Sequence, residues 1–273
     1  IRTPSPQNRM VSFPYPKLMN SNSNVDQGAA LILCSVEKAR ALGIPEDRFV
    51  YPHAGTDAHD TYFVSNRESR HRTPAIRIAG RRALELAGVE AAHLAQLDVY
   101  SCFPVAVQVA AEEIGLPADR PWTVTGGLTF GGGPLNNYVM HGIARMAEVL
   151  RADPGSKGLC TANGGYLTKP AFGVYSTAPP ETPFQFADRQ AEVDTLPPRE
   201  LDPSARGEAT IESYTVMYAD DAPSMGHAAC RLPDGRRAWA NIPDTELAAA
   251  MTREEFCGRA CQLDGEGTLT VTN

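Results

Sequence analysis

Between residues 26 and 177 the chain alternates strand-like runs with amphipathic helical runs, and no other sequence feature constrains its fold as strongly. Thr73 before Pro74 places a hydroxyl at an N-cap and proline at the first helical position, which predicts a helix that ends at Gly88. Other segments have a helical or strand period: helices at 26–42, 103–114 and 135–150, and strands at 97–100, 158–165 and 171–176. This alternation predicts an α/β domain, residues 26–177, in which helices are layered on a mixed sheet.

The first 42 residues divide into two parts. Residues 1–25 are rich in Pro, Asn and Ser and lack any period, so they are predicted to form an extended loop. In the predicted helix at 26–42, residues 29–34 are apolar on nearly every side, whereas a surface helix has a single apolar stripe. We therefore expect this helix to be buried on more than one side.

The character of the sequence changes after Thr177. Prolines are frequent and no period is visible at 178–207, which predicts a linker. Residues 208–273 follow, with strand-like runs at 209–218, 226–232, 236–242 and 268–272, a turn at 233–235 and a short helix at 245–251. These features predict a small β-rich domain. An OB-like barrel fits them, and other small β folds fit as well.

Charge and cysteine usage narrow the classes of function. The chain has 25 Lys and Arg against 32 Asp and Glu, a formal net charge of −7, which argues against general attraction to nucleic acid or anionic lipid. Residues 207–273 carry eleven acidic residues against five Arg and no Lys, so a nucleic-acid face is not expected there either. No apolar run is long enough for a membrane span, and no secretory signal is present. The six cysteines are scattered and suit neither a CxxC pair nor a zinc site, so we expect reduced thiols and a cytoplasmic protein.

Cys102 is the first candidate for chemistry. It follows the strand predicted at 97–100 and lies at the start of a helix, with Ser101 as the predicted N-cap. Unpaired N–H groups and the positive end of the helix favour a thiolate there, which suits a nucleophile or an acid–base thiol. The alternative is a small, half-buried core residue without a chemical role.

Five glycines between Gly126 and Pro134 form a second candidate. Such a loop lets a ligand approach the backbone closely, with N–H groups directed at an anion. It matches neither a P-loop nor a dinucleotide fingerprint, and ordinary tight turns are the alternative interpretation.

His53, Asp57, His59 and Asp60 have side chains of metal-ligating types. They are predicted to lie in an Ala/Gly-rich loop, where no helical spacing would bring them together. Ligand type without geometry is weak evidence, so no metal site is predicted.

Four blocks of the sequence, in this order, resemble motifs of the thiolase superfamily. Residues 26–30 are similar to the DGAAA start of the second thiolase half, and residues 97–103 resemble the HDCF block of sterol-carrier-type thiolases. Residues 126–134 resemble the GGL…GHP loop, and residues 163–165 fall where the last glycine-rich active-site loop belongs. The resemblance covers roughly residues 8–177. With the added β domain, it points to thiolase-like proteins that carry an additional C-terminal domain, often labelled acetyl-CoA acetyltransferases.

The resemblance implies a fold of two similar βαβαβαββ halves, of which this chain has the second. It also implies an acyl-CoA or acetyl-CoA thioester as substrate, no permanently bound cofactor, and formation or cleavage of a carbon–carbon bond. In the family a cysteine of the first half is acylated. The chain, which starts at Ile1, is therefore expected to begin partway through a larger protein and to need that first half or a partner chain for activity. Homo-oligomers are a further expectation.

The resemblance also assigns site residues. Cys102 matches the second family cysteine, which moves a proton at the carbon nucleophile, and Tyr100 stands in the histidine position of HDCF. Substrate-binding positions are implied at Gly132, Gly133, Asn163 and Gly164.

Gly133 stands where the GHP loop has its histidine, and a glycine cannot take a proton from a thiol. Two functions therefore stay open. Cys102 and the glycine loops favour an acyltransferase, and Gly133 favours a non-catalytic acyl-CoA binding or scaffold subunit.

Overall fold

The computed structural model describes residues 1–271, and the chain divides into two compact units. The β-rich unit comprises residues 1–19, 63–70 and 197–273. The α/β unit comprises residues 20–62 and 71–196.

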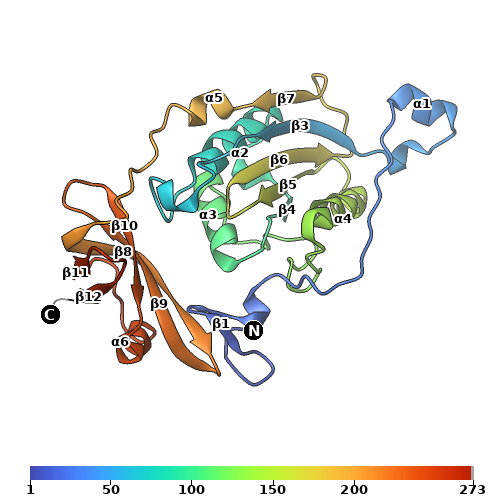
Figure 1. The fold of residues 1–273 in the computed structure, drawn as a ribbon. Helices are drawn as coiled ribbons and strands as arrows, with labels where there is room; N and C mark the ends of the chain where they lie inside the picture. The colour runs from blue at the N-terminus through green and yellow to red at the C-terminus, as the bar shows by residue number, and fades with distance from the viewer. Residues whose placement is uncertain (272–273) are drawn as a thin grey trace. The chain divides into compact units, whose positions relative to one another are not determined.

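The α/β unit is built on a five-stranded mixed sheet with the order β4-β5-β6-β3-β7 (Figure 1). Its strands are β3 (Tyr51–Asp57), β4 (Gln96–Asp98), β5 (Lys157–Gly164), β6 (Lys169–Ser176) and β7 (Gln185–Asp188). The three central strands pair antiparallel, whereas β4 and β7 join the two edges in parallel. The predicted α/β fold with a mixed sheet is confirmed.

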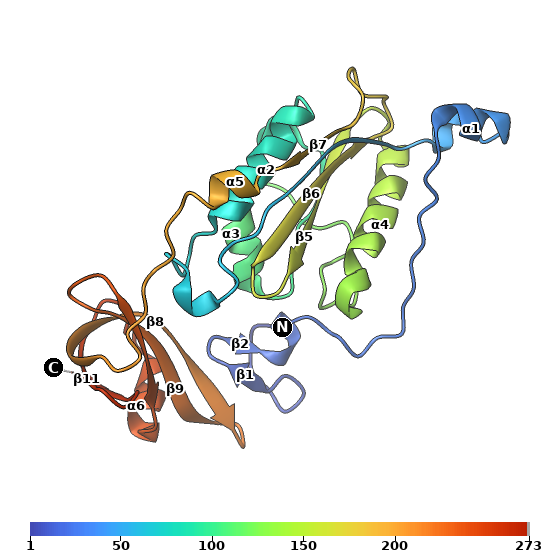
Figure 2. The same cartoon turned by 45° about the horizontal axis from the view of Figure 1, so that its top comes forward.

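Helices cover both faces of this sheet. Helices α2 (Pro74–Leu86) and α3 (Pro104–Ile114) lie on one face, and α4 (Tyr138–Ala152) lies on the other (Figure 2). Helix α2 packs closely because most of its buried residues are alanine or glycine, and a Cβ on Gly80 would lie 2.8 Å from Ile114 Cγ1. The core of these layers includes buried side chains from strands and helices: Ile76, Leu84, Leu97, Leu159 and Val174.

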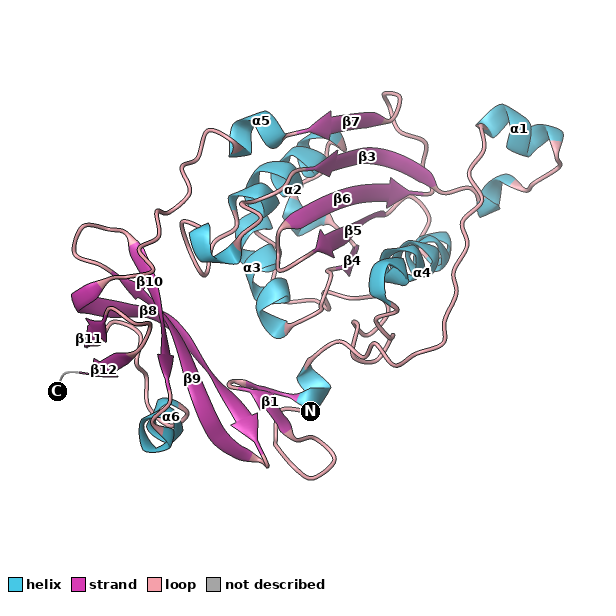
Figure 3. Ribbon diagram, in the orientation of Figure 1, coloured by secondary structure: helices cyan, strands magenta, loops and turns pink. Residues whose placement is uncertain are grey.

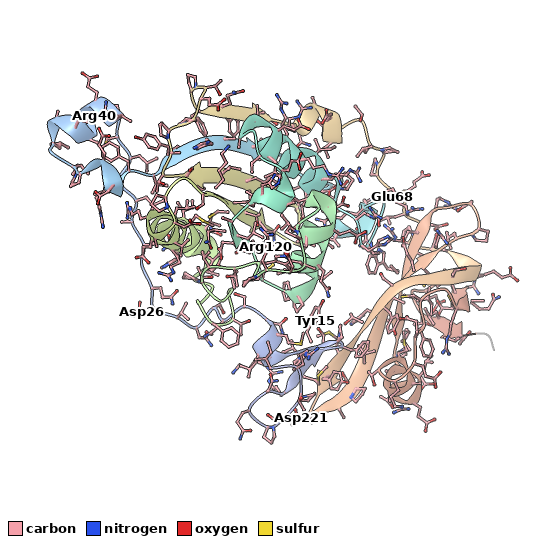
Figure 4. All side chains as sticks on the ribbon, turned by 180° about the vertical axis from the view of Figure 1, so that it is seen from behind. Tyr15, Asp26, Arg40, Glu68, Arg120 and Asp221 are labelled. Carbon is pink, nitrogen blue, oxygen red and sulfur yellow. The ribbon has the colours of Figure 1, made fainter. Side chains whose placement is uncertain are left out.

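The prediction of a helix at 26–42 is wrong over most of that range. Only α1 (Val36–Ala41), which Ser35 caps, is helical, and the residues before it run as extended chain. Figure 4 shows Asp26 on this extended segment and Arg40 on α1. Ile32 is 96% exposed and Leu33 is 81% exposed. A helix that is apolar on several sides is stable only where other elements bury those sides, and this segment is largely exposed in the described structure.

Regular structure also occurs in two segments for which none was predicted. Within residues 1–25, β1 (Met10–Ser12) pairs with β2 (Tyr15–Pro16) and, at Ser12, with the distant Met217. The predicted linker at 178–207 contains β7 and the short helix α5 (Gln190–Val193). Such short edge elements depend on partners far away in the sequence, so their own residues carry no recognisable period.

The β-rich unit contains the remaining strands and one helix (Figure 3). These elements are β8 (Arg206–Ala219), β9 (Ala222–Arg231), β10 (Arg237–Ile242), α6 (Thr245–Met251), β11 (Ala260–Asp264) and β12 (Leu269–Val271). The predicted turn at 233–235 joins β9 to β10, and the helix at 245–251 is confirmed; β11 was not predicted.

The strand pairings of this unit lead from β10 through β9 and β8 to β11 and β12. A parallel bridge between Asn241 and Thr268 leads back to β10. A returning path of this kind agrees with a small barrel, and the OB-like type stays a prediction.

The loop at 63–70 belongs to the β-rich unit although it lies between β3 and α2 in the sequence. The fully buried Arg237 binds this loop. Its guanidinium donates to the Ser65 carbonyl at 2.8 Å and to the Glu68 carbonyl at 3.1 Å, and it forms a bidentate pair with the Glu212 carboxylate.

The remaining elements are single 3-10 turns: η1 (Lys17–Met19), η2 (Glu46–Arg48), η3 (Val64–Asn66), η4 (Ala91–His93) and η5 (Leu135–Asn137). No helix in the described part of the chain combines the length and apolar composition that a bilayer crossing needs.

Candidate functional site

Cys102 lies in the short connection between β4 and α3, with its side chain partly buried. Strands β4 and β5 are parallel neighbours, so the residues at their carboxyl ends meet at one edge of the sheet. Asn163, near the end of β5, directs its Nδ2 donor at Cys102 Sγ across 3.6 Å. The structure thus brings together two of the predicted site residues.

The surroundings of the Cys102 thiol shift its pKa upward. Burial raises its pKa, and the hydrogen bonds from Asn163 and from the Phe103 backbone offset that effect only in part. The prediction of a thiolate favoured by the helix end is therefore wrong. The N-cap position of α3 is held by Phe103, so Cys102 lies outside the helix, and desolvation outweighs the helix end. A thiol that keeps its proton suits a proton donor better than a permanently ionised nucleophile.

Ser101 does not cap the helix. Its Oγ accepts a hydrogen bond of 3.0 Å from the Leu128 N–H, which ties the Cys102 connection to the glycine loop, residues 126–134. At Gly127, which has a φ of +82°, a Cβ would lie 2.7 Å from this Oγ. The glycine is therefore required both by its backbone conformation and by the close approach of Ser101.

Residues 20–27, here called the strap, run along the glycine loop and the Cys102 connection. A Cβ on Gly132 would lie 2.7 Å from Gln27 Oε1, and a Cβ on Gly133 would collide with Ser21 Oγ. Four hydrogen bonds hold the strap in place: Thr129 Oγ1 to Asn20 O (2.8 Å), Ser21 N to Cys102 O (3.0 Å), Asn22 N to Leu128 O (3.1 Å) and Gly133 N to Asn22 O (2.8 Å). The two predicted loop glycines thus lie against the strap and are buried.

Tyr100 lies beside Cys102 with its phenol half-buried. Its backbone N–H donates to Thr161 Oγ1 at 2.9 Å, and its ring packs edge-on against Tyr138 with centroids 5.4 Å apart. Burial, and secondarily the neighbouring Cys102, raise the pKa of Tyr100. The phenol therefore keeps its proton and is chemically able to donate a hydrogen bond.

The Asp98 carboxylate connects several segments around the site, although the sequence alone predicts no role for this residue. Its carboxylate is buried at the end of β4 and accepts four hydrogen bonds: from Thr123 Oγ1 (2.9 Å), Val124 N (3.2 Å), Thr125 Oγ1 (3.3 Å) and Tyr138 OH (3.0 Å). Burial raises the pKa of Asp98, and the bonds from its neighbours act against that rise. The carboxylate links β4 to the start of the glycine loop and to α4. The available signal was an acidic residue between two apolar ones in a buried strand.

Two other predicted positions differ in their support. Asn163 Oδ1 is buried and makes no hydrogen bond within the described residues, so this amide keeps an unused acceptor near Cys102. Gly164 is the last residue of β5 and pairs with Lys169 of β6, so its place at the site rests on its adjacency to Asn163.

The segment with metal-ligating residue types is not the loop that was predicted. Residues His53 to Asp57 belong to β3, and the His53 ring lies 2.9 Å from the Ala178 carbonyl oxygen. Among residues 1–271, no group of three or more His, Cys, Asp or Glu side chains could hold a metal ion.

Comparisons with known proteins agree with this fold. The family model "Thiolase-like protein type 1 additional C-terminal domain" matches residues 188–268. An acetyl-CoA acetyltransferase of Methanocaldococcus jannaschii is 30% identical over 99 residues, which cover 36% of this chain and 25% of the relative. The crystal structure of a monomeric SCP2-thiolase-like protein type 1 from Mycobacterium smegmatis is similar with a TM-score of 0.85 and 37% identity, over 99% of this chain and 60% of that one.

The fold and sequence together define the class: this is a thiolase-like α/β fold followed by an additional β-rich domain. The chain is similar in sequence and in fold to proteins of the thiolase superfamily. It spans about 60% of the length of its solved relative and a quarter of its curated one.

Proposed function

We propose that this chain is the second half of an acyl-CoA acyltransferase of the thiolase type, which forms or cleaves a carbon–carbon bond next to a CoA thioester. The observation that carries the proposal is the grouping of Cys102, Asn163 and the glycine loop at one edge of the sheet. The acetyl-CoA acetyltransferase relative supports the choice of substrate class.

In this proposal Cys102 moves a proton. Its raised pKa keeps hydrogen on sulfur, so it can deliver a proton to a carbanion next to the thioester carbonyl and recover it in the reverse direction. Asn163 Nδ2 orients the sulfur and stabilises its anionic form when the proton has left. Tyr100, a protonated phenol beside Cys102, is proposed as a donor to the substrate.

The acyl group needs an acceptor cysteine, and the proposed mechanism assigns that role to no residue of this chain. We propose that a first thiolase half, in the same polypeptide or in a partner chain, supplies it, and that the chain alone is inactive. The exposed apolar residues Ile32 and Leu33 would be covered in that assembly. No cofactor is bound permanently, because the CoA thioester itself is the activated group. The protein is proposed to be cytoplasmic, in keeping with its six free cysteines, and to form homo-oligomers.

One observation favours a second candidate function. Gly133 offers no side chain to the site, and Ser21 fills the space beside it, so a thiol-activating base is missing from this loop. The alternative is a subunit that binds acyl-CoA and has no turnover.

The test compares acyl-CoA binding, turnover and covalent adducts, the last by intact mass, for the chain alone and for the protein that carries both thiolase halves. We expect turnover and an adduct only with both halves. Cys102→Ala should lower turnover by about 100-fold or more, as expected for loss of a general acid–base group. Cys257→Ala, which removes an exposed thiol of the β-rich unit, is the matched control. Binding with no turnover in the two-half protein would establish the alternative instead.

A further inference from the structure

The Ser21 hydroxyl sits on a well-held stretch of backbone and makes no hydrogen bond to the described part of the chain. The backbone of the strap is hydrogen-bonded on each side of it, because Ser21 N, Asn22 N and Asn22 O all have partners and Asn20 O accepts from Thr129. The side chain itself is half-buried and makes no hydrogen bond within residues 1–271. The backbone that carries this hydroxyl is thus held in place, and the hydroxyl keeps its hydrogen-bonding capacity for a ligand.

The position of this hydroxyl is set by Gly133. A Cβ at residue 133 would collide with Ser21 Oγ. The strap therefore places this oxygen where any residue other than glycine at position 133 would place its side chain. Ser21 N also donates to the backbone carbonyl of Cys102, which ties the strap to the residue that carries the candidate thiol. The hydroxyl therefore belongs to the same cluster as Cys102, although some 80 residues separate the two in the sequence.

We infer that Ser21 is a residue of the acyl-CoA site and that its hydroxyl donates a hydrogen bond to the carbonyl oxygen of the bound thioester. The inference rests on the proposed function, because it needs a thioester beside Cys102. A neutral hydroxyl donates one proton to an oxygen that gains negative charge as the bond next to the carbonyl forms or breaks. The bond is therefore stronger in the transition state than in the ground state, and it contributes more to turnover than to binding.

The experiment uses the protein that carries both thiolase halves and the variant Ser21→Ala. Two probes are compared by calorimetry: acetyl-CoA, and ethyl-CoA, a thioether that has the same chain but no carbonyl. We expect Ser21→Ala to weaken the binding of acetyl-CoA by about five- to tenfold, which is the value of one hydrogen bond. The affinity for ethyl-CoA should stay unchanged. The turnover number should fall by about 100-fold with a smaller change in KM.

Ser23→Ala is the matched control, because Ser23 is an exposed serine of the same strap. It should leave both affinities and turnover as they are. An equal loss of affinity for both probes in Ser21→Ala would show that Ser21 has only a structural role in the strap, and it would overturn the inference. An unchanged affinity for acetyl-CoA would overturn it as well. If the unaltered protein binds neither probe, the proposed function fails and takes the inference with it; if it binds both and Ser21→Ala has no effect, only the inference fails.

Discussion

Arg237 offers the sharpest test of how the β-rich unit is held together. The side chain is fully buried, and the loop at 63–70 depends on it for three carbonyl contacts, those of Ser65, Arg67 and Glu68. Its other partner is the Glu212 carboxylate, in two hydrogen bonds of 2.6 and 2.9 Å. Arg237→Leu removes all of these bonds and leaves a mostly buried carboxylate with no countercharge from Arg237.

Breaking a buried ion pair by removing one partner costs about 3–5 kcal/mol, because the other charge stays desolvated. Since Glu212 keeps 17% of its side-chain exposure, we expect the lower end, about 3 kcal/mol. For a chain of this size that corresponds to a fall in Tm of roughly 6–12 °C.

Thermal unfolding by circular dichroism measures this loss, and brief trypsin digestion reports on the loop. Arg67 and Arg70 are cleavage points inside the loop, so its release should accelerate cutting there. Arg236→Ala is the control, because Arg236 is the neighbouring arginine and its side chain keeps 39% of its exposure in the ion pairs with Asp234 and Asp202. If Arg237→Leu unfolds at the same temperature as Arg236→Ala and is cut no faster than the unaltered chain, the reasoning is refuted.

The pair also has a pH signature. Burial acts to raise the pKa of Glu212, but the hydrogen bonds and charge of Arg237 outweigh it, so the pKa is lowered on folding. A lowered carboxylate pKa contributes stability that is fully present above the unfolded value, about 4.3, and is lost as the pH falls through the folded value. The stability difference between the unaltered chain and Glu212→Gln should therefore be constant from about pH 7 to pH 5 and shrink below about pH 4. A difference that grows on acidification would contradict this account.

Two further predictions concern the site. Gly142→Ala places a Cβ 2.5 Å from Asp98 Oδ2, so we expect the free energy of unfolding, measured in urea, to fall by about 1–3 kcal/mol. An unchanged urea midpoint would contradict this expectation. Because burial raises the pKa of Cys102, its alkylation by iodoacetamide, followed by peptide mass, should rise with pH to beyond about pH 9. Asn163→Ala, which removes a bond that lowers this pKa, should move the profile to higher pH, and a plateau below about pH 8 in the unaltered chain would contradict the assignment.

Local sequence signals were sufficient for two kinds of element: those stabilised by their own neighbours along the chain, and those that bury one face in a continuous core. The Thr73–Pro74 start, the buried small-residue face of α2 and the turn at 233–235 lie where the sequence predicts them. The signal failed at 26–42, because helical periodicity describes which sides could be buried but not whether anything is there to bury them. It also failed at β1 and β7, whose pairing partners are distant in the sequence.

The candidate site divides in the same way. The sequence was enough to show the residue types and their order: Cys102 after a strand, the glycines at 126–133, and Asn163 near the end of another strand. It also showed the resemblance to the thiolase superfamily. The sequence could not show that Cys102 lies outside the helix end and is desolvated, which reverses the expected direction of its pKa. Nor could it show that Asp98 links three elements or that Ser21 occupies the space beside Gly133. Composition and period are properties of neighbours along the chain, whereas desolvation and close approach depend on which distant segments meet, and only the tertiary structure decides that.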